Sequence, residues 1–280
     1  MTLETRALQP DQSGRRPDGA ISCPRIRWRD GAAQLGAREI PEETPVALIY
    51  DASSYAVMMA TPLDLEDFAL GLSLTEGVIA ARDDIQDMEI VRGELGIEVR
   101  MWLAPGKREA LATRRRRLAG PTGCGLCGID SLTEAARIPP GVTGELSLTS
   151  RDILEAMAAL EPAQTLGAST RAVHAAGFWL PGAGLVALRE DVGRHNALDK
   201  LAGALARDGQ AGDRGAVLLT SRVSVEMVQK TAVIGASILV AVSAPTAFAV
   251  RTAETAGITL VAVARSDGFE VFTHPERIAL

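Results

Sequence analysis

Short apolar runs and amphipathic segments follow one another along the second half of the chain. Apolar runs stand at residues 216–219, 238–242 and 258–264, and helical spacing is found at residues 195–207, 224–235 and 245–256. Strands that alternate with helices of this length indicate βαβ crossovers and a mostly parallel sheet. The runs show no polar alternation, so we expect these strands to be buried on both faces.

Further elements flank this block. A helix capped by Ser150 is predicted to run to residue 160, and strands at residues 172–180 and 184–188 are joined by a hairpin turn. A last strand is predicted at residues 269–273. In the first half, a helix at residues 63–76 is predicted among four strands, at residues 46–50, 55–60, 85–90 and 97–102.

This pattern divides the chain into four parts. Residues 1–22 predict a disordered tail, residues 23–118 a small α+β domain, residues 119–145 a mobile loop and linker, and residues 146–280 an α/β domain. Residues 231–250 carry no charge, but Pro245 interrupts them. We expect a helix end, a strand and a new helix there rather than a membrane span.

Composition narrows the functional classes. Of the 280 residues, 47% are hydrophobic and only 4% aromatic, so the core is expected to consist mainly of Ala, Val, Leu and Ile. The net charge of −6 argues against a general nucleic-acid binder, because such proteins are usually basic. The few cysteines and the polar N-terminus, which lacks an apolar segment, indicate a reduced, cytoplasmic protein.

Two of the three cysteines, Cys124 and Cys127, lie in a glycine-rich segment at residues 122–128. A pair of thiols at this spacing serves as a redox disulfide, as half of a metal site or as a sulfur carrier. Four arginines at residues 114–117 precede the pair. They are either a solvated charge run or a docking strip for phosphates or an acidic partner, and they would favour a thiolate nearby. Cys23 is interpreted as incidental because no second ligand lies near it.

Polar loops follow the predicted strands of the second half. They lie at residues 190–195, 220–224, 243–246 and 265–268. The carboxyl ends of parallel strands share one edge, and the helix N-termini that follow offer amides to an anion. Arg194 and Arg222 add guanidinium groups suited to phosphate, whereas Ser221, Ser224 and Thr246 also suit ordinary helix capping. We expect a phosphate-bearing ligand at this edge.

Four segments in this order carry a resemblance to a known family. They are CGLCG (residues 124–128), EDVGRHNALDK (190–200), SVEMVQK (224–230) and SAPT (243–246). Together they resemble the FdhD family, the formate dehydrogenase accessory sulfurtransferases, and the likeness extends from residue 61 to residue 275. The thiol pair alone is common, whereas the long second segment is specific.

The resemblance implies an α/β fold: a three-layer, cytidine-deaminase-like α/β/α C-terminal domain beside a smaller α+β domain. It also implies that sulfur is taken as a persulfide from a cysteine desulfurase. That sulfur passes to the molybdenum of bis-molybdopterin guanine dinucleotide, the bound acceptor, which formate dehydrogenase needs for activity. Cys124 matches the persulfide cysteine and Cys127 its companion. A homodimer without a metal of its own is expected.

The residues expected to bind the cofactor come from two sources. The family's cofactor-binding stretch matches Val263, Ala264, Arg265, Ser266, Asp267 and Gly268, and the polar loops suggest Arg194, His195, Arg222 and Ser224. Glycines that the family usually has are replaced by Arg171, Ala172 and Ser221. The first two lie beside His174, for which a core role and a pocket role are equally expected.

Several hypotheses remain open from the sequence. Cys127 either releases the sulfur by forming a disulfide with Cys124 or stabilises the persulfide. Besides a sulfur carrier, the chain can be a non-catalytic cofactor chaperone, a zinc-dependent deaminase or, less favoured, a thiol–disulfide oxidoreductase. The deaminase is disfavoured because the H-x-E at residues 274–276 follows the cysteine pair instead of preceding it.

Overall fold

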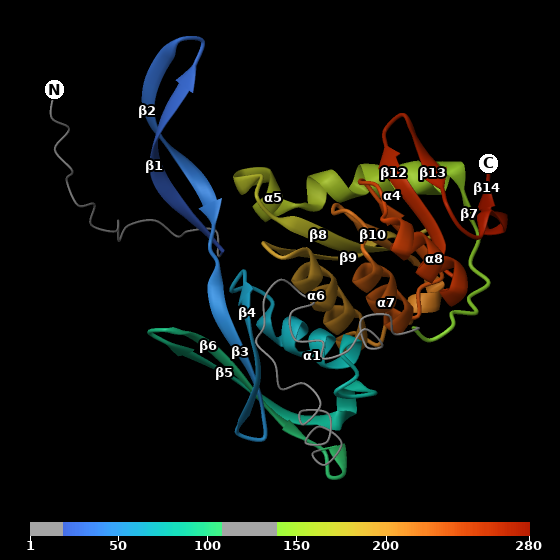
Figure 1. Ribbon diagram of the computed structural model, residues 1–280, viewed down its shortest axis with the longest axis horizontal. Helices are drawn as coiled ribbons and strands as arrows, with labels where there is room; N and C mark the ends of the chain where they lie inside the picture. Colours follow the sequence, from blue (N-terminus) through green and yellow to red (C-terminus); the bar gives the residue numbers. More distant parts are fainter. Residues whose placement is uncertain (1–18, 108–138) are drawn as a thin grey trace, which may run out of the picture.

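The computed structural model describes residues 19–107 and 139–280 of the chain. Its largest sheet has six strands in the order β13-β12-β11-β10-β8-β9 (Figure 1). The strands are β8 (His174–Leu180), β9 (Gly184–Asp191), β10 (Ala216–Leu219), β11 (Ile238–Ala241), β12 (Thr259–Arg265) and β13 (Gly268–Val271).

The direction of these strands corrects one prediction. The central strands β10, β11 and β12 pair in parallel, as expected, and β8 and β9 form the predicted hairpin, but β8 also pairs antiparallel with β10, and β13 pairs antiparallel with β12. Short connections join β8 to β9 and β12 to β13, and only antiparallel neighbours can be joined that way. Strands β9 to β12 therefore all run in one direction, and their carboxyl ends share one edge.

Helices cover both faces of this sheet. On one face lie α6 (Arg194–Arg207), α7 (Val225–Ile234) and α8 (Ala247–Ala256), and on the other lies α4 (Ser150–Ala163). Within β10, Val217 and Leu219 face the first layer, and Ala216 and Leu218 face the second. The predicted three-layer α/β/α arrangement is confirmed (Figure 1).

Local details differ from the predicted elements. The N-cap of α4 is Thr149, one residue earlier than predicted, and its hydroxyl accepts from the Asp152 amide at 3.1 Å. A short helix, α5 (Thr165–Thr170), follows α4 and was not expected. Two further short strands, β7 (Leu148–Thr149) and β14 (Ile278–Ala279), pair in parallel. Short 3₁₀ helices span Arg82–Asp84, Gly212–Arg214 and Pro275–Arg277.

The uncharged stretch at residues 231–250 comprises the end of α7, strand β11 and the start of α8, as the sequence predicts. Across the described ranges, every helix is too short or too polar to cross a membrane.

The N-terminal unit is a four-stranded sheet with one helix packed on one face. Its strands lie in the order β4-β3-β6-β5, with bounds β3 (Thr44–Tyr50), β4 (Ser53–Ala60), β5 (Ile85–Gly93) and β6 (Gly96–Leu103). Helix α1 (Leu65–Thr75) covers it, and Phe68 is buried against Leu48, Tyr50 and Val99. This agrees with the α+β prediction.

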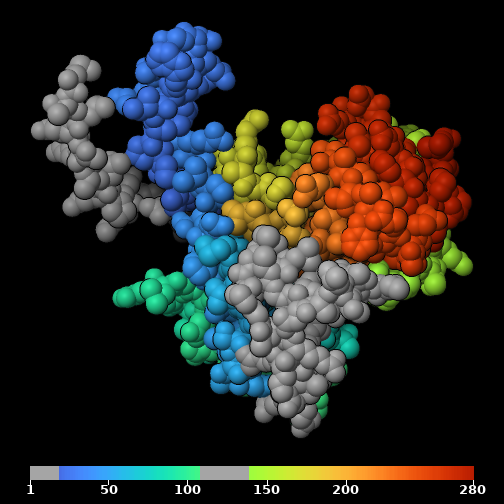
Figure 2. Space-filling model, viewed as in Figure 1, coloured from blue at the N-terminus to red at the C-terminus, as the bar shows by residue number. Residues whose placement is uncertain are grey.

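A two-stranded ribbon precedes this unit. Strand β1 (Ala20–Arg29) pairs antiparallel with β2 (Ala32–Pro41) over its whole length. We call this ribbon the arm; its tip stands clear of the α/β body, and its base lies beside α5 (Figures 1 and 2). The prediction of a disordered tail over residues 1–22 is wrong at its end, because the strand begins at Ala20.

The N-terminal unit and the α/β body are joined through α1 and α6. A methyl group on Gly71 of α1 would lie 1.7 Å from the Asp199 carbonyl oxygen of α6. One on Gly203 of α6 would lie 1.9 Å from the Asp67 carbonyl oxygen of α1. The two helix backbones therefore touch, and only glycine fits at either position.

Candidate functional site

The segment EDVGRHNALDK, which carries the family resemblance, is mostly buried at the joint between the two units. The Asp191 carboxylate lies 2.7 Å from Lys200 Nζ, and neither side chain is exposed. Asp191 also accepts hydrogen bonds from the amides of Thr61 and Gly193 and from Asn196 Nδ2. These residues hold the start of α6 to the N-terminal unit, which the sequence did not reveal.

The same segment holds α5 and α7. Glu190 accepts hydrogen bonds from the amides of Leu166 and Gly167 at 2.9 and 2.7 Å. Asp199 pairs with Lys230 of α7 at 2.7 Å, and burial raises the pKa of the Asp199 carboxyl while Lys230 opposes that rise. Most charged groups of the segment are therefore structural, and its polar side chains at the sheet edge are Arg194 and His195.

Arg194, His195 and Ser224 each bring to the carboxyl edge of the sheet a polar atom without a hydrogen-bond partner among the described residues. Arg194 and His195 begin α6, and Ser224 is the N-cap of α7 without a side-chain capping bond. Arg194 Nε, His195 Nε2 and Ser224 Oγ are buried and have no hydrogen-bond partner among the described residues. Buried polar atoms normally have partners, so this edge suits a polar ligand. Thr246, by contrast, caps α8 as the alternative interpretation expected.

Glu226, a residue that sequence analysis did not single out, faces His195. The distance from His195 Nε2 to Glu226 Oε2 is 4.0 Å, which is within ion-pair range and beyond hydrogen-bond range. His195, and to a smaller extent Ser224, lowers the pKa of the Glu226 carboxyl to about 2 against the effect of burial. Burial, then Arg194 and His195, lower the pKa of His174, the first residue of β8.

The low Glu226 pKa predicts a loss of stability in acid. The ordinary value is 4.5, so the carboxylate's contribution is complete above about pH 5 and is lost as the pH falls toward 2. Between about pH 5 and pH 3, the wild type should lose about 2 kcal/mol more free energy of unfolding than Glu226→Gln. Urea denaturation at both pH values measures this.

The control for that prediction is Glu155→Gln on α4, which removes an exposed carboxylate paired with Arg151. It should lose as much stability in acid as the wild type. Equal acid losses in the wild type and in Glu226→Gln would contradict the role of Glu226.

The stretch matched to the family's cofactor-binding segment lies at the end of β12 and continues into β13. Val263 has φ = 52°, a left-handed conformation that is rare for a β-branched residue, and the β12–β13 register shifts beside it. Its amide donates to the Ser243 carbonyl at 3.4 Å, and Val223 bridges to Pro245. The loops after β10 and β11 and the end of β12 therefore form one continuous edge, and strain at Val263 is of a kind that clusters at functional sites.

The structure places the other residues predicted to bind the cofactor, but not the two predicted catalytic cysteines. Ala264 is buried, Gly268 is half-buried, and Arg265, Ser266 and Asp267 are exposed, all beside Val263. Arg222 is exposed in the loop after β10. Cys124, Cys127 and residues 114–117 lie outside the described residues. Cys23 is a free, half-buried thiol in β1.

Arg171, one of the residues that replace a glycine, is the C-cap of α5 with φ = 54°. This left-handed conformation favours glycine, which agrees with the glycine expected here from the family resemblance. Arg171→Gly should raise the free energy of unfolding by about 1 kcal/mol. Chemical denaturation measures this, with Ala158→Gly at an exposed position in the interior of α4 as the control that should be destabilised by about 1 kcal/mol. A lower free energy of unfolding in Arg171→Gly would contradict the view that the left-handed conformation at this position favours glycine.

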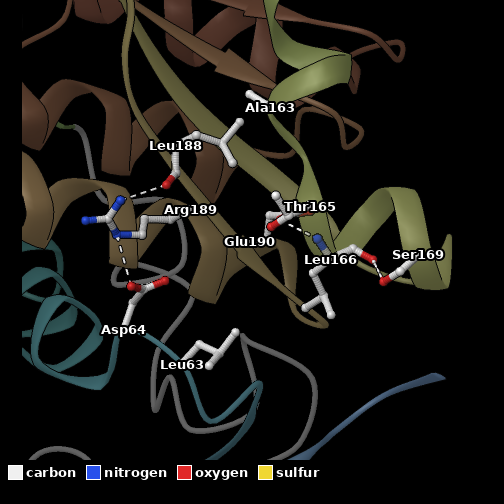
Figure 3. A pocket seen from close by; sticks show the side chains of 9 residues that line it. All are labelled: Leu63, Asp64, Ala163, Thr165, Leu166, Ser169, Leu188, Arg189 and Glu190. Carbon is white, nitrogen blue, oxygen red and sulfur yellow. Dashed lines mark hydrogen bonds and ion pairs between the residues drawn. The ribbon is translucent and has the colours of Figure 1, made fainter. Parts of the chain in front are cut away.

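A cavity of about 320 Å³ lies beside the last residues of β9, among α5, β9 and the segment before α1 (Figure 3). Its charged groups are already paired: Arg189 contacts Asp64 and Asp67, and Glu190 binds the α5 amides. The cavity does not include the residues predicted to bind the cofactor.

The H-x-E segment lies at the opposite edge of the sheet. His274 Nδ1 lies 3.3 Å from Glu276, and the His274 carbonyl accepts from Thr259, the first residue of β12. The site residues follow the last residues of that strand, so His274 is not near them. Over residues 19–107 and 139–280, no three His, Cys, Asp or Glu side chains are grouped to hold a metal ion.

Comparisons with known proteins identify a family and relatives that match most of this chain. Residues 41–279 match the FdhD/NarQ family. The chain is similar to a protein of Agrobacterium fabrum named sulfur carrier protein FdhD, with 53% identity over 257 residues, or 91% of this chain and 95% of the relative. A protein of the same name from Cupriavidus necator is 53% identical over 253 residues, or 90% of this chain and 88% of the relative.

A solved structure extends this likeness. Its description names a formate dehydrogenase accessory protein from Desulfotalea psychrophila, and it is 27% identical, with a TM-score of 0.73 over 93% of this chain and 99% of that one. The match to the family covers most of the chain, including both units and the polar edge of the sheet. The chain belongs to the FdhD/NarQ family.

Proposed function

We propose that this chain is a sulfur carrier. It takes sulfur as a persulfide from a cysteine desulfurase and delivers it to the molybdenum of bis-molybdopterin guanine dinucleotide, the acceptor substrate, for use by formate dehydrogenase. The observation that carries the proposal is the 53% identity, over 91% of the chain, to a protein named sulfur carrier protein FdhD. The cysteine pair and the polar sheet edge supply the chemistry this function needs.

Loading is a thiol–persulfide exchange at Cys124. The Cys124 thiolate attacks the outer sulfur of the donor's persulfide, a new S–S bond forms, and the donor cysteine leaves as a thiolate. No net oxidation occurs, because the sulfur passes between two cysteines in the same oxidation state. Glycines stand on both sides of Cys124, so no neighbouring side chain hinders the approach of the donor's persulfide to the thiol.

Delivery as sulfide needs two electrons. If Cys127 attacks Cys124 Sγ, the outer sulfur leaves as hydrosulfide and the two thiols are oxidised to a disulfide, which supplies those electrons. A thiol reductant must then restore the pair. If Cys127 instead only stabilises the persulfide, the loaded wild type releases sulfide only when an external thiol reductant such as dithiothreitol is added.

The sheet edge supports recognition of the acceptor. Arg194 Nε, His195 Nε2 and Ser224 Oγ have no hydrogen-bond partner there among the described residues. They are donors of the kind that bind phosphate oxygens, and the exposed Arg222 adds a second guanidinium. We assign the phosphates of the acceptor to these groups and its guanosine end to residues 263–268.

Intact-protein mass spectrometry after incubation with a cysteine desulfurase and cysteine tests the carrier step. The wild type and the control Cys23→Ala should gain one sulfur atom, and Cys124→Ala should gain none. A gain that persists in Cys124→Ala would overturn the assignment of the carrier cysteine. If no variant gains sulfur, the carrier function fails; bound zinc would then favour the deaminase and its absence the cofactor chaperone.

Acceptor recognition has its own test, with guanosine diphosphate as the probe in calorimetry. Arg194→Ala should weaken binding at least 10-fold, since charged hydrogen bonds contribute about 1.5–3 kcal/mol. The matched control is Arg151→Ala, an exposed arginine of α4, which should bind like the wild type. Equal binding by both variants would overturn the phosphate assignment while leaving sulfur loading untouched.

A further inference from the structure

The carboxyl edge of the sheet continues past the loop after β10 to the start of β8. Thr220 Oγ1 accepts a hydrogen bond from the Ala175 amide at 2.8 Å, and the Thr220 amide donates to the Ala175 carbonyl at 3.1 Å. His174, the first residue of β8, is paired in register with Asp191 at the end of β9. The edge therefore runs from Val263 on β12, past the loops after β11 and β10, to the segment that joins α5 to β8 (Figure 1).

Two arginines stand at that end of the edge, one from α5 and one from the arm. Arg171 is exposed and directly follows α5. Arg38 of β2 is also exposed, and its Nη2 donates to the carbonyl of Thr170, the last residue of α5, at 3.0 Å. Neither arginine forms an ion pair with another residue that the structure describes. Two guanidinium groups without a counter-charge in this part of the chain attract anions.

These two arginines extend the set of cations to which we assigned the phosphates. Burial, and then the charges of Arg194 and His195, lower the pKa of His174, so both residues lie close to the start of β8. Arg194 Nε and His195 Nε2 are among the buried polar atoms without a hydrogen-bond partner in the described ranges. Cations therefore continue along the edge beyond the phosphate site, on the side away from residues 263–268.

The backbone at Arg171 is strained. Its φ of 54° and ψ of 34° lie in the left-handed region, which favours glycine, and the family resemblance also expects a glycine there. The arginine side chain forms no hydrogen bond to another described residue that would offset this strain. Backbone strain of this kind clusters at ligand-binding and active sites. The strain is therefore a second observation, besides charge, that favours a ligand at Arg171.

We propose, on the basis of the function proposed above, that Arg171 and Arg38 bind the molybdopterin end of the acceptor, beyond its diphosphate. The guanosine end is assigned to residues 263–268 and the phosphates to Arg194 and His195, so the remaining end of a ligand that follows the edge reaches residues 171–173. The dithiolene sulfurs of molybdopterin carry negative charge, which suits guanidinium groups. The acceptor thus has one direction along the edge, and sulfur is delivered beside the segment between α5 and β8.

Guanosine triphosphate tests this direction, because its third phosphate is attached where the acceptor has its molybdopterin end. In calorimetry without magnesium, the wild type should bind guanosine triphosphate about 10-fold more tightly than guanosine diphosphate, since the third phosphate gains charged hydrogen bonds from Arg171 and Arg38. The double variant Arg171→Gly with Arg38→Gln should bind the two nucleotides with equal dissociation constants. It should fold, because both positions are exposed and the glycine relieves the strain.

Two controls separate this result from the phosphate site itself. Arg194→Ala should weaken both nucleotides alike and keep the ratio of their dissociation constants, and Arg151→Ala on α4 should change neither constant. Equal binding of both nucleotides by the wild type would overturn the proposed direction and leave the phosphate site standing. A preference for the triphosphate that survives in the double variant would do the same. A wild type that binds neither nucleotide would overturn the direction and the phosphate site together.

Discussion

The Lys200→Met variant is expected to lose about 3–5 kcal/mol of the free energy of unfolding. Lys200 and Asp191 form a 2.7 Å ion pair without any exposed surface, and Lys200 Nζ also donates to the Thr61 carbonyl at 2.9 Å. Removing one member of a buried pair leaves the other charge without compensation, which is far more costly than losing an exposed pair. Urea denaturation followed by circular dichroism measures the loss.

A matched control is Lys107→Met, which removes the lysine of the more exposed Lys107–Asp84 pair, 3.0 Å apart. It should cost no more than about 1 kcal/mol. The double variant Lys200→Met with Asp191→Asn should recover part of the loss, since it removes the uncompensated charge. If Lys200→Met loses as little free energy of unfolding as Lys107→Met, the buried pair does not hold the N-terminal unit to the α/β body.

Gly203→Ala is expected to cost about 3 kcal/mol, the upper part of the range for overpacking. The added methyl would lie 1.9 Å from the Asp67 carbonyl oxygen and 2.9 Å from its Cα, so α1 and α6 must move apart. In an exposed helix, the same change would be stabilising by about 1 kcal/mol. The sign of the effect therefore distinguishes a close helix contact from an ordinary helical glycine.

Gly71→Ala on the facing helix should behave like Gly203→Ala, because its methyl would lie 1.7 Å from the Asp199 carbonyl oxygen. The control is Gly141→Ala, where an added methyl meets no atom within 4 Å. Its free energy of unfolding should change by less than about 0.5 kcal/mol. Neutral or stabilising results at both Gly71 and Gly203 would contradict the contact between the helix backbones.

The sequence predicts the α/β body well because its strands are short, apolar and separated by helices of constant length. It misses the arm, although apolar residues alternate with arginines from Arg25 to Arg29, because Pro24 interrupts the first strand and Gly36 the second. It also predicts too much parallel pairing, since the direction of β8 and β13 depends on which neighbour each strand joins.

The candidate site is predictable to the extent that it follows from topology. Arg194, Arg222 and residues 263–268 reach one edge because strands β9 to β12 share a direction. Glu226 is missed because its approach to His195 depends on α6 and α7 lying side by side, which no spacing in the sequence records. The Asp199–Lys230 pair is missed for the same reason, since it joins groups 31 positions apart.

The burial of Asp191, Asp199 and Lys200 affects how a function should be assigned to other members of this family. The segment at residues 190–200, which identifies the family, mainly holds the N-terminal unit to the α/β body. The thiols proposed to carry the sulfur, Cys124 and Cys127, lie elsewhere along the chain. A relative without those thiols could still have the buried ion pairs of this segment, and its sequence would still match the family. Assigning sulfur transfer to any member therefore requires inspecting the cysteine pair in its own right.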